Sequence, residues 1–314
     1  MVSDIEGLAQ GVDDGGKVAQ AGPGRQRAHL DNAAPERNLV AMTRETIRNA
    51  LLRPREAPSC AVITGATGGI GAAFARALPE DTRLILTGRD TVRLDELAAE
   101  FGDRARPMVA DLATADGIEA VANAADAEGA DLFINNAGLG AYGEFLAADF
   151  EKHRTTLRVN VEAVLDLMHR VVPGMVDRAE LSGRRAGLIN VASSAAFFPI
   201  PTLATYAASK ALVLSFTESF AAEMSGKPID VLAACPGAVK TGFGARAGFE
   251  LGAMPGAMAP EKVAAQALAA LGRQSTVVIG PASAAAFAPV ALARSLFGQA
   301  FIRASRVMER VNRG

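Results

Sequence analysis

The stretch Cys60-Ala-Val-Ile-Thr-Gly-Ala-Thr-Gly-Gly-Ile-Gly71 decides the fold of this chain. Its first part, Cys60–Thr64, is a short apolar run that is typical of a buried strand. A glycine-rich loop follows over Gly65–Gly71, and the next residues predict a helix over Ala72–Leu78. Glycines allow a tight turn and a close approach of the backbone to a ligand, and the first N–H groups of a helix bind anions. Strand, loop and helix in this order predict a site for a phosphate-bearing nucleotide.

Strands and helices alternate along the rest of the chain. Two long helices are predicted, over Glu151–Met175 and over Ala204–Ser225, and both have lengths typical of crossover helices. Short apolar runs predict further strands, which are centred near Leu84, Val109, Leu132, Ile189, Val231 and Val277. This alternation predicts an α/β fold, namely a single Rossmann-type domain with a doubly wound parallel sheet.

Composition divides the 314 residues into four predicted parts. Residues 1–41 are rich in Gly, Ala, Asp, Gln and Arg and lack apolar periodicity, so they are predicted to be disordered. They also lack the apolar core of a secretory signal. Three interpretations of this segment stay open: a regulatory arm, an extension without a function, or an upstream start with Met42 as the true initiator. Residues 42–57 predict a lead-in helix, residues 58–281 the Rossmann domain, and residues 282–314 an amphipathic helical segment.

The segment Tyr206-Ala-Ala-Ser-Lys210 holds an acid/base pair. Side chains four positions apart share a helix face, so Lys210 is expected near the Tyr206 phenol. A neighbouring positive charge lowers the pKa of a phenol, which then exchanges a proton with a carbonyl or alcohol oxygen more readily. An isolated pair of this kind is more often a surface feature. Ser193 follows the predicted strand Ala186–Ala192, where its hydroxyl would bind the same oxygen or simply end the strand.

Asn160 lies in a mostly apolar helical stretch, where an amide side chain costs stability unless it is hydrogen-bonded. Two roles for it stay open. It holds a water molecule that relays protons to Lys210, or it bonds a neighbouring carbonyl group. Nothing in the sequence separates the two.

Five motifs together resemble the short-chain dehydrogenase/reductase family over roughly residues 59 to 280. The segment Thr64–Gly71 matches the TGxxxGIG cofactor loop, and Asn135–Gly138 matches the NNAG motif. The segment Pro236–Thr241 matches PGxVxT, whose threonine bonds the nicotinamide carboxamide in the family. The family's catalytic set is matched, in order and at similar spacing, by Asn160, Ser193, Tyr206 and Lys210.

The resemblance implies an NAD(P)-dependent oxidoreductase that transfers a hydride between its cofactor and a carbonyl/alcohol substrate. In that scheme Tyr206 is the acid/base, Lys210 lowers its pKa and binds the nicotinamide ribose, Ser193 positions the substrate oxygen and Asn160 supports a proton relay. The tail more loosely resembles bacterial members with a C-terminal helical extension. The residues that the resemblance implies for cofactor binding are Gly65, Thr67, Gly69, Ile70, Gly71, Arg89, Asp111, Asn136, Ala137, Gly138, Tyr206, Lys210, Pro236, Gly237, Val239 and Thr241.

The residues after the second predicted strand favour NADP over NAD. An acidic residue at that place usually holds the ribose of NAD, whereas an arginine suits the 2′-phosphate of NADP. Here Gly88 and Arg89 follow the strand, and Arg89 would form a charge-assisted hydrogen bond with the phosphate unless it is a solvated side chain. Asp90 is expected to cap the next helix. Gly68 stands where some NADP-dependent members carry a basic residue.

Charge and ligand patterns argue against several other functions. A net charge of −2 gives no basic field for nucleic acid. His29, His153 and His169 lack metal-ligand spacing, so no metal site is predicted. Cys60 and Cys235 fall in or beside predicted buried strands without a nearby histidine, which predicts neither a disulfide nor a thiol nucleophile. Free cysteines fit a reducing cytoplasm.

Apolar residues and arginines alternate over residues 284–312, which predicts a basic amphipathic helix. The simpler interpretation is that this helix covers a sheet edge or forms a dimer contact. The sharper one is peripheral attachment to an anionic membrane surface. Charges are expected to interrupt the segment too often for a transmembrane span.

The substrate pocket is expected in the loops after the fourth and fifth strands and in the segment after Thr241. These loops hold no basic cluster apart from Lys240 and Arg246, so the expected substrate is an apolar carbonyl or alcohol. The segment Phe243–Met258 is expected to close over it as a lid. The apolar candidates for the pocket wall are Leu139, Tyr142, Phe145, Phe197, Phe198, Phe243, Phe249, Leu251 and Met254.

Two other functions stay open. The chain could be a non-catalytic NADP-binding redox sensor on the same fold, although a complete catalytic set argues against this. It could also be a membrane-docked reductase of lipid or fatty-acyl carbonyls, which the arginines of the tail motivate. By analogy with the family, a cytoplasmic homo-oligomer is expected, with peripheral membrane contact in the second alternative.

Overall fold

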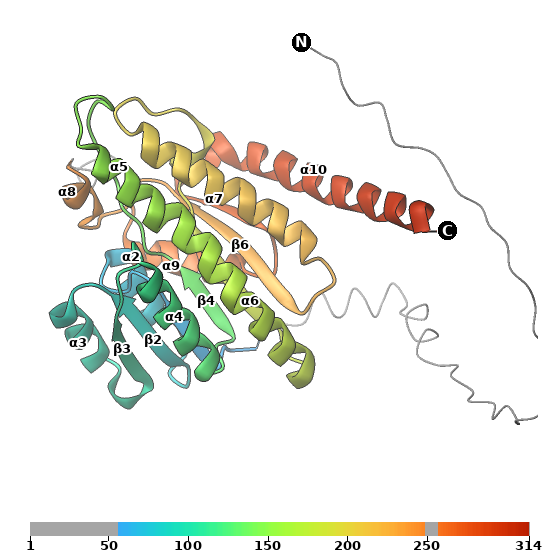
Figure 1. Ribbon diagram of the computed structural model, residues 1–314, viewed down its shortest axis with the longest axis horizontal. Helices are drawn as coiled ribbons and strands as arrows, with labels where there is room; N and C mark the ends of the chain where they lie inside the picture. The colour runs from blue at the N-terminus through green and yellow to red at the C-terminus, as the bar shows by residue number, and fades with distance from the viewer. Residues whose placement is uncertain (1–55, 249–256, 314) are drawn as a thin grey trace, which may run out of the picture. The chain divides into compact units, whose positions relative to one another are not determined.

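A seven-stranded sheet with the order β3-β2-β1-β4-β5-β6-β7 forms the centre of the computed structural model (Figure 1). The structure describes residues 56–248 and 257–313. The predicted disordered arm and all of the predicted lead-in helix except residues 56 and 57 therefore lie outside the described part.

Every pair of neighbouring strands in the sheet is parallel, which confirms the predicted Rossmann-type, doubly wound sheet. The strand order changes direction between β1 and β4, and open sheets of this kind bind ligands outside the carboxyl ends of the strands at such a point. The strands are β1 (Cys60–Ile63), β2 (Arg83–Gly88), β3 (Ala105–Val109), β4 (Leu132–Asn135), β5 (Ala186–Val191), β6 (Ile229–Pro236) and β7 (Thr276–Ile279).

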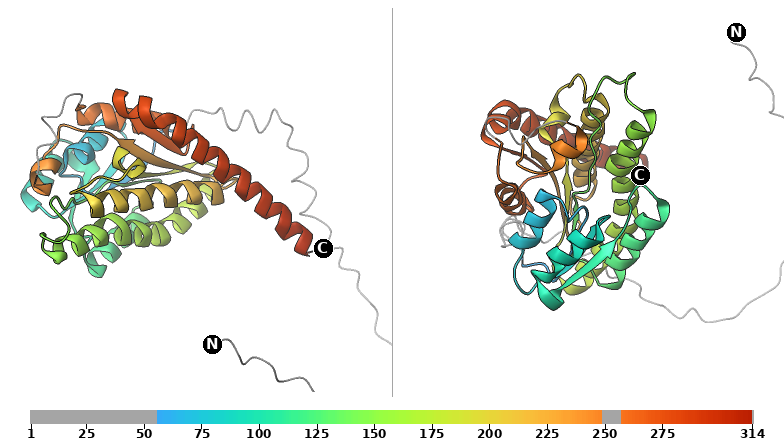
Figure 2. Two further views of the ribbon diagram at one scale, coloured as in Figure 1. Left: turned by 90° about the horizontal axis from the view of Figure 1, so that it is seen from above. Right: turned by 90° about the vertical axis from the view of Figure 1, so that its left-hand side faces the viewer.

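Helices cover both faces of the sheet (Figures 1 and 2). Short 3-10 turns lie at Gly102–Arg104 and Ser194–Phe197, and a π-helical turn lies at Arg158–Glu162. The α-helices are α2 (Gly69–Ala77), α3 (Thr91–Ala99), α4 (Ala115–Ala127), α5 (Phe150–Leu157), α6 (Ala163–Ser182), α7 (Ala204–Glu223), α8 (Phe243–Ala247), α9 (Pro260–Ala270) and α10 (Pro281–Arg313).

Two apolar cores lie on opposite faces of the sheet, because successive side chains of a strand point to opposite sides. Strand β1 shows the alternation: Cys60 and Val62 pack with α4, α6 and α7, whereas Ala61 and Ile63 pack with α2, α3 and α9. The inner strands are buried on both faces, so they form continuous apolar runs rather than alternating ones.

Side-chain caps mark the starts of several helices. The Asp90 carboxylate accepts a hydrogen bond from Arg93 N at 3.2 Å, which confirms its predicted role as the cap of α3. The Thr114 hydroxyl accepts one from Gly117 N at 3.1 Å and starts α4 in the same way. Such caps satisfy N–H groups that have no partner within the helix.

The long helix predicted over Glu151–Met175 consists of α5, the π-helical turn and α6, and it continues to Ser182. Gly183 follows the last helical residue, and its φ of 70° is a conformation that glycine readily adopts directly after a helix. The π-helical turn carries the buried Asn160. Single π-helical turns occur often at functional sites, and nothing in the sequence pattern distinguished this turn from ordinary helix.

Helix α10 confirms a helical C-terminal segment and runs as one element over 33 residues, with Pro289 inside it. Its first turns pack on the sheet and on α7. The Phe287 ring stacks on the rings of Phe197 and Phe198, with centroids 5.1 and 5.3 Å apart. The C-terminal half of α10 extends past the end of the sheet (Figure 2).

The expectation that charges exclude a membrane span is wrong for the first part of α10. In the described part of the chain, one stretch, Ser283–Phe301, is long and apolar enough to cross a membrane by length and composition, and only 6 % of it is buried. The arginines that suggested an interruption are concentrated after this stretch, which contains only Arg294. Length and composition alone do not distinguish a span from a helix that lies on a surface.

Candidate active site

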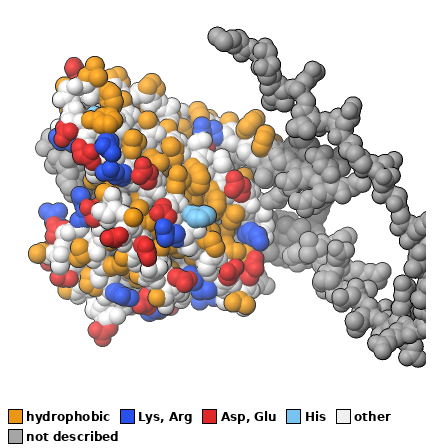
Figure 3. Space-filling model, in the orientation of Figure 1, with side chains coloured by type: hydrophobic (Ala, Val, Ile, Leu, Met, Phe, Trp, Pro, Cys, Tyr) orange, Lys and Arg blue, Asp and Glu red, His pale blue; other side chains and the backbone are white. Residues whose placement is uncertain are grey.

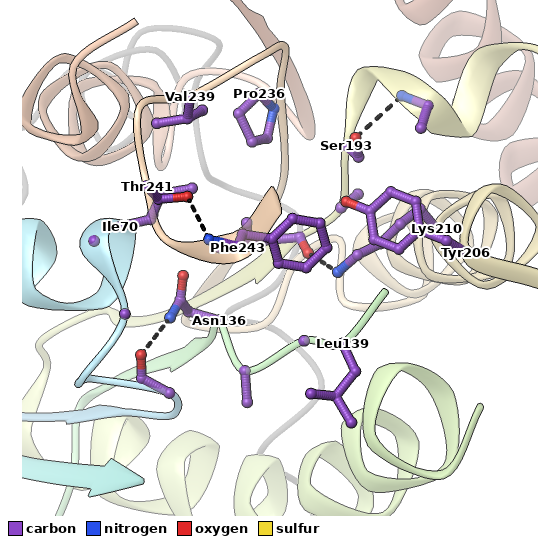
Figure 4. A pocket seen from close by; sticks show the side chains of 18 of the residues that line it. Ile70, Asn136, Leu139, Ser193, Tyr206, Lys210, Pro236, Val239, Thr241 and Phe243 are labelled. Carbon is purple, nitrogen blue, oxygen red and sulfur yellow. Dashed lines mark hydrogen bonds between the residues drawn. The ribbon is translucent and has the colours of Figure 1, made fainter. Parts of the chain in front are cut away.

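A cavity of about 870 Å³ opens at the carboxyl ends of the strands (Figure 4). Its wall combines the glycine-rich loop before α2, the ends of β2, β4, β5 and β6, and the first turns of α7 and α10. Most of the predicted site residues lie in this wall, namely Gly65, Thr67, Gly69, Ile70, Arg89, Asp111, Asn136, Ala137, Gly138, Ser193, Tyr206, Lys210, Pro236, Gly237, Val239 and Thr241. Of the predicted set, Gly71 and Asn160 do not line it.

The loop between β1 and α2 needs its glycines for steric reasons. Gly65 has a φ of 64°, and a Cβ atom on it would lie 2.7 Å from Ala137 Cα. A Cβ on Gly71 would lie 2.4 Å from Gly65 O, so Gly71 keeps the loop folded back on itself. A Cβ on Gly69 would meet the Thr241 Cγ2 atom at 2.6 Å. The loop therefore presents bare backbone to the cavity at the start of α2.

Thr64 holds this loop against the end of β4, a role that the sequence did not reveal. Its hydroxyl accepts hydrogen bonds from Asn136 N and Ala137 N, both at 3.0 Å. In return, Asn136 Nδ2 donates to Thr64 O at 2.9 Å and to Gly65 O at 3.0 Å. The Asn136 side chain is thus committed to the loop backbone, and its contribution to the site is structural.

Tyr206, Lys210 and Ser193 come together on one side of the cavity (Figure 4). Ser193 lies two residues after the end of β5 and caps the 3-10 turn Ser194–Phe197, where a hydrogen bond with it lowers the pKa of Tyr206. The Ser193 Oγ also accepts a hydrogen bond from Ala195 N at 3.1 Å. Lys210 lies one turn after Tyr206, with its Nζ 6.0 Å from the centre of the phenol ring. Its Nζ donates to Val191 O at 2.8 Å.

Burial sets the protonation of this pair. Burial raises the pKa of Tyr206, and the hydrogen bond with Ser193 lowers it by less. Burial also lowers the pKa of Lys210, to about 8. The expectation that Lys210 holds the tyrosine pKa below its ordinary value is not met in this geometry. The reason is that burial of the phenol outweighs its hydrogen bond with Ser193, while the Lys210 amine donates to the Val191 carbonyl.

Asn160 forms a clamp on the backbone beside the cavity. Its Oδ1 accepts a hydrogen bond from Leu139 N at 2.8 Å, and its Nδ2 donates to Leu139 O at 2.9 Å. The same Nδ2 donates to Ser209 Oγ at 3.0 Å, which ties the π-helical turn to α7. The side chain therefore bonds a neighbouring carbonyl group, as the second of the two interpretations expects, and the proton relay through a water molecule stays a prediction.

Two arginines stand at the other end of the cavity. Arg89 and Arg93 line it there with Asp90, and Arg89 has no hydrogen bond or ion pair with any described residue. The Asp90 carboxylate caps α3 through its hydrogen bond with Arg93 N, and its Oδ2 forms an ion pair with Arg93 Nε at 3.4 Å. The Asp111 carboxylate accepts from Ala113 N at 3.0 Å, so its side chain stabilises the turn after β3. Arg93 was missed because it lies inside a predicted helix rather than directly after the strand.

The predicted apolar pocket wall is correct in part. Leu139, Tyr142, Phe198 and Phe243 line the cavity, and the Phe243 ring lies 5.4 Å from the Tyr206 ring. Phe145 and Phe197 do not line it, because Phe145 packs against Phe150 and His153 and Phe197 packs against Phe287. Phe249, Leu251 and Met254 lie outside the described residues, as do residues 249–256, which make up half of the expected lid. Met258, at the end of the expected lid, lines the cavity, and lining residues that the sequence did not suggest include Val159, Ile200, Leu203, Pro281 and Ser283.

Neither cysteine lines the cavity, although Cys235 lies close enough to Lys210 to act on its pKa. Cys60 and Cys235 are free and buried, and burial raises the pKa of the first thiol to about 11 and of the second to about 12. His153 is buried, with its Nδ1 2.9 Å from Thr205 Oγ1. Within residues 56–248 and 257–313, no three His, Cys, Asp or Glu side chains are grouped closely enough to bind a metal ion.

Comparison with known proteins identifies the family. The family model for short chain dehydrogenases matches residues 59–249. Nodulation protein G of Rhizobium sp. (strain N33) is 35 % identical over 184 residues, which is 58 % of this chain and 73 % of that protein. A short-chain dehydrogenase from Sphingobium yanoikuyae in complex with NADPH is 30 % identical, with a TM-score of 0.63 over 70 % of this chain and 86 % of that one. The 3-ketoacyl-(acyl-carrier-protein) reductase from Brucella melitensis complexed with NADH is 25 % identical, with a TM-score of 0.64 over 72 % and 97 %. This chain belongs to the short-chain dehydrogenase family.

Proposed function

We propose that this NAD(P)-dependent oxidoreductase transfers a hydride between NADP(H) and the carbonyl/alcohol group of an apolar substrate. One observation carries the proposal: the Tyr206 hydroxyl, its hydrogen-bond partner Ser193 and the Lys210 amine share one cavity with a glycine-rich loop at the start of a helix. A proton donor and an anion site are thus present at opposite ends of one space.

The residues of this cavity suit a nicotinamide dinucleotide. The backbone of the loop Gly65–Gly71 and the free N–H groups of α2 would hold the pyrophosphate, because glycines of this loop line the cavity at the start of the helix. A Cβ on Gly138 would lie only 3.4 Å from Lys210 Nζ, so this glycine leaves the amine open toward a ribose. Thr241 is available to the carboxamide. The bound cofactor supplies or accepts the hydride.

The chain itself handles the proton. Tyr206 Oη gives its proton to the substrate carbonyl oxygen during reduction or takes one from the alcohol during oxidation, and Ser193 Oγ holds that oxygen by a hydrogen bond. Because burial raises the Tyr206 pKa, the phenol is protonated at neutral pH, which suits the reductive direction. Asn160 fixes the peptide of Leu139, and Leu139 lines the cavity.

The preference for NADP over NAD is supported by charge at the cavity end. Arg89 and Arg93 offer positive charge to a 2′-phosphate, whereas the nearby Asp90 is engaged by the cap of α3. Replacing Arg89 by Leu should raise the KM for NADPH at least tenfold and leave the KM for NADH nearly unchanged. Arg273→Leu, at an exposed arginine away from the cavity, is the matched control. Equal changes for both cofactors would remove Arg89 from this role.

The substrate class is supported by the apolar wall around Tyr206, which includes Leu139, Phe198, Leu203 and Phe243. The test is oxidation of NADPH and NADH over ketones and aldehydes of graded chain length, with Tyr206→Phe as the control. Turnover that grows with apolar length and disappears in the variant supports the proposal. Tight cofactor binding without turnover on any carbonyl would favour the non-catalytic redox sensor instead.

We also propose a homo-oligomer in a reducing compartment such as the cytoplasm. Leu212 and Phe216 of α7 are partly exposed, and hydrophobic side chains gather on the side of the molecule where α6 and α7 lie (Figure 3). Both cysteines are free and buried, as suits a cell interior that reduces disulfides. Light scattering of the wild type beside a Leu212→Glu variant tests the first point, and an unchanged mass would remove this face as the contact.

A further inference from the structure

One face of α10 binds the chain's own core along its first half. Ala291 is buried there, and the Phe287 ring stacks on Phe197 and Phe198. Arg294 Nε donates to Glu218 Oε2 at 2.8 Å, and the Ser295 and Ser275 hydroxyls are 3.0 Å apart. These contacts hold the helix on β7 and α7 as far as Ser295.

Large apolar side chains line the sides of α10 that these contacts leave uncovered. Between 47 % and 72 % of each of these side chains is exposed, and the set, called here the α10 stripe, is Val290, Leu292, Leu296, Phe297 and Phe301. Positions 290, 297 and 301 are seven and four residues apart, which places them on one side of a helix. An exposed apolar row of this size on a folded protein marks an interaction surface.

The charges on α10 indicate which kind of partner binds the α10 stripe. Arg294 is the only charged residue between Ser283 and Phe301, and Glu218 neutralises it. After Phe301 the helix carries four arginines, at positions 303, 306, 310 and 313, and one acidic residue, Glu309. An apolar row followed by basic residues matches a membrane whose interior is apolar and whose headgroups are anionic. A second copy of α10 would offer the same arginines almost no negative charge.

We infer that α10 docks the enzyme on the surface of an anionic bilayer, with the α10 stripe in the interface and the basic end among the headgroups. The helix lies on the membrane and does not cross it. Crossing would require it to lose the contacts of Phe287, Ala291 and Arg294 with the rest of the domain. The inference is independent of the substrate, because it concerns binding and not turnover.

The absence of tryptophan from the chain allows a direct test. Phe297→Trp in the full-length protein places one fluorophore in the stripe at a 72 % exposed site. Its emission should shift to the blue with vesicles of phosphatidylcholine mixed with phosphatidylglycerol, and much less with phosphatidylcholine alone. Added salt should weaken the anionic component, because it screens exposed charges.

Variants of the stripe give the control. In co-sedimentation with the anionic vesicles, Phe297→Asp and Leu296→Asp should each weaken binding about tenfold or more, because each removes one apolar side chain from the interface. Leu181→Asp, at an 88 % exposed leucine of α6, should leave binding unchanged, and circular dichroism checks that all three variants fold. No spectral shift with anionic vesicles, or equal loss in the Leu181 variant, overturns the inference. So does a Phe297→Asp variant that splits an oligomer yet still binds the vesicles, because the stripe would then face a second copy.

Discussion

Replacing Lys210 by Met should change how the stability of the fold depends on pH. Burial lowers the Lys210 pKa from its ordinary 10.5 to about 8, so the folded state releases this proton at a lower pH than the unfolded chain does. Between these two values the unfolded chain binds more protons, and the free energy of unfolding therefore rises with pH. Below about pH 8 both states are protonated, and the cost of burying the charge is present in full.

The size of the effect follows from the same two pKa values. The full difference corresponds to about 3 kcal/mol, and most of it should be gained between pH 7 and pH 10. Tyr206, Cys60 and Cys235 have raised pKa values, so each contributes an opposite slope once the pH exceeds its ordinary pKa. Those slopes are common to wild type and variant and cancel in the difference between them.

The assay is urea unfolding at 25 °C, followed by circular dichroism at several pH values from 7 to 10, for the wild type and for Lys210→Met. Met has a similar length without the charge, so the variant should be more stable than the wild type near pH 7, and the gap should close as the pH rises. A constant gap across this range would refute the reasoning. It would mean either that the Val191 carbonyl keeps Lys210 charged over this whole pH range, or that the Lys210 amine is open to water.

Three further predictions concern single sites. Gly71→Ala should weaken cofactor binding about tenfold or more in a fluorescence titration, because the added Cβ would lie 2.4 Å from Gly65 O. The control Gly298→Ala should leave cofactor binding unchanged, because its added Cβ would have no atom within 4 Å. Equal cofactor affinities of the two variants would contradict the prediction. Asn160→Ala should lower the free energy of unfolding by about 2–4 kcal/mol, because it removes three hydrogen bonds and leaves the Leu139 peptide group without its partner. Replacing the exposed Asn123 by Ala should change the free energy of unfolding little. Similar losses of stability in the two variants would contradict the role of Asn160 as a clamp. Neither cysteine of the native protein should react with a disulfide reagent at pH 8 until urea unfolds the chain, because both thiols are buried with raised pKa values, and rapid labelling of the native state would disprove it.

Sequence reasoning recovered those parts of the site that depend on local chemistry. The glycine loop, the strand end at Ser193 and the helical pair Tyr206 and Lys210 each follow from the residues within one or two turns of chain, and the structure places them in one cavity. The cap at Asp90 was predictable for the same reason, since it depends on a residue three positions away.

Features that depend on contacts between distant segments were not predictable. Adjacent residues Phe197 and Phe198 look alike in the sequence, yet only Phe198 lines the main cavity. Thr64 binds Asn136 and Ala137 across more than 70 positions, which no local pattern reveals. The direction of the Tyr206 pKa shift was also missed, because helical spacing gives the neighbour of a phenol but not how deeply the pair is buried.

The way in which α10 begins has a practical consequence for protein engineering. Pro281 and Ser283 belong to the cavity wall, and the helix is anchored on the domain as far as Ser295. A chain cut at the apparent end of the Rossmann domain, near residue 282, would therefore lose part of its binding site as well as its tail. A crystallisation variant should instead stop between Ser295 and Phe301, where the hydroxyl contact with Ser275 is kept and the most exposed aromatic residues can be removed or replaced.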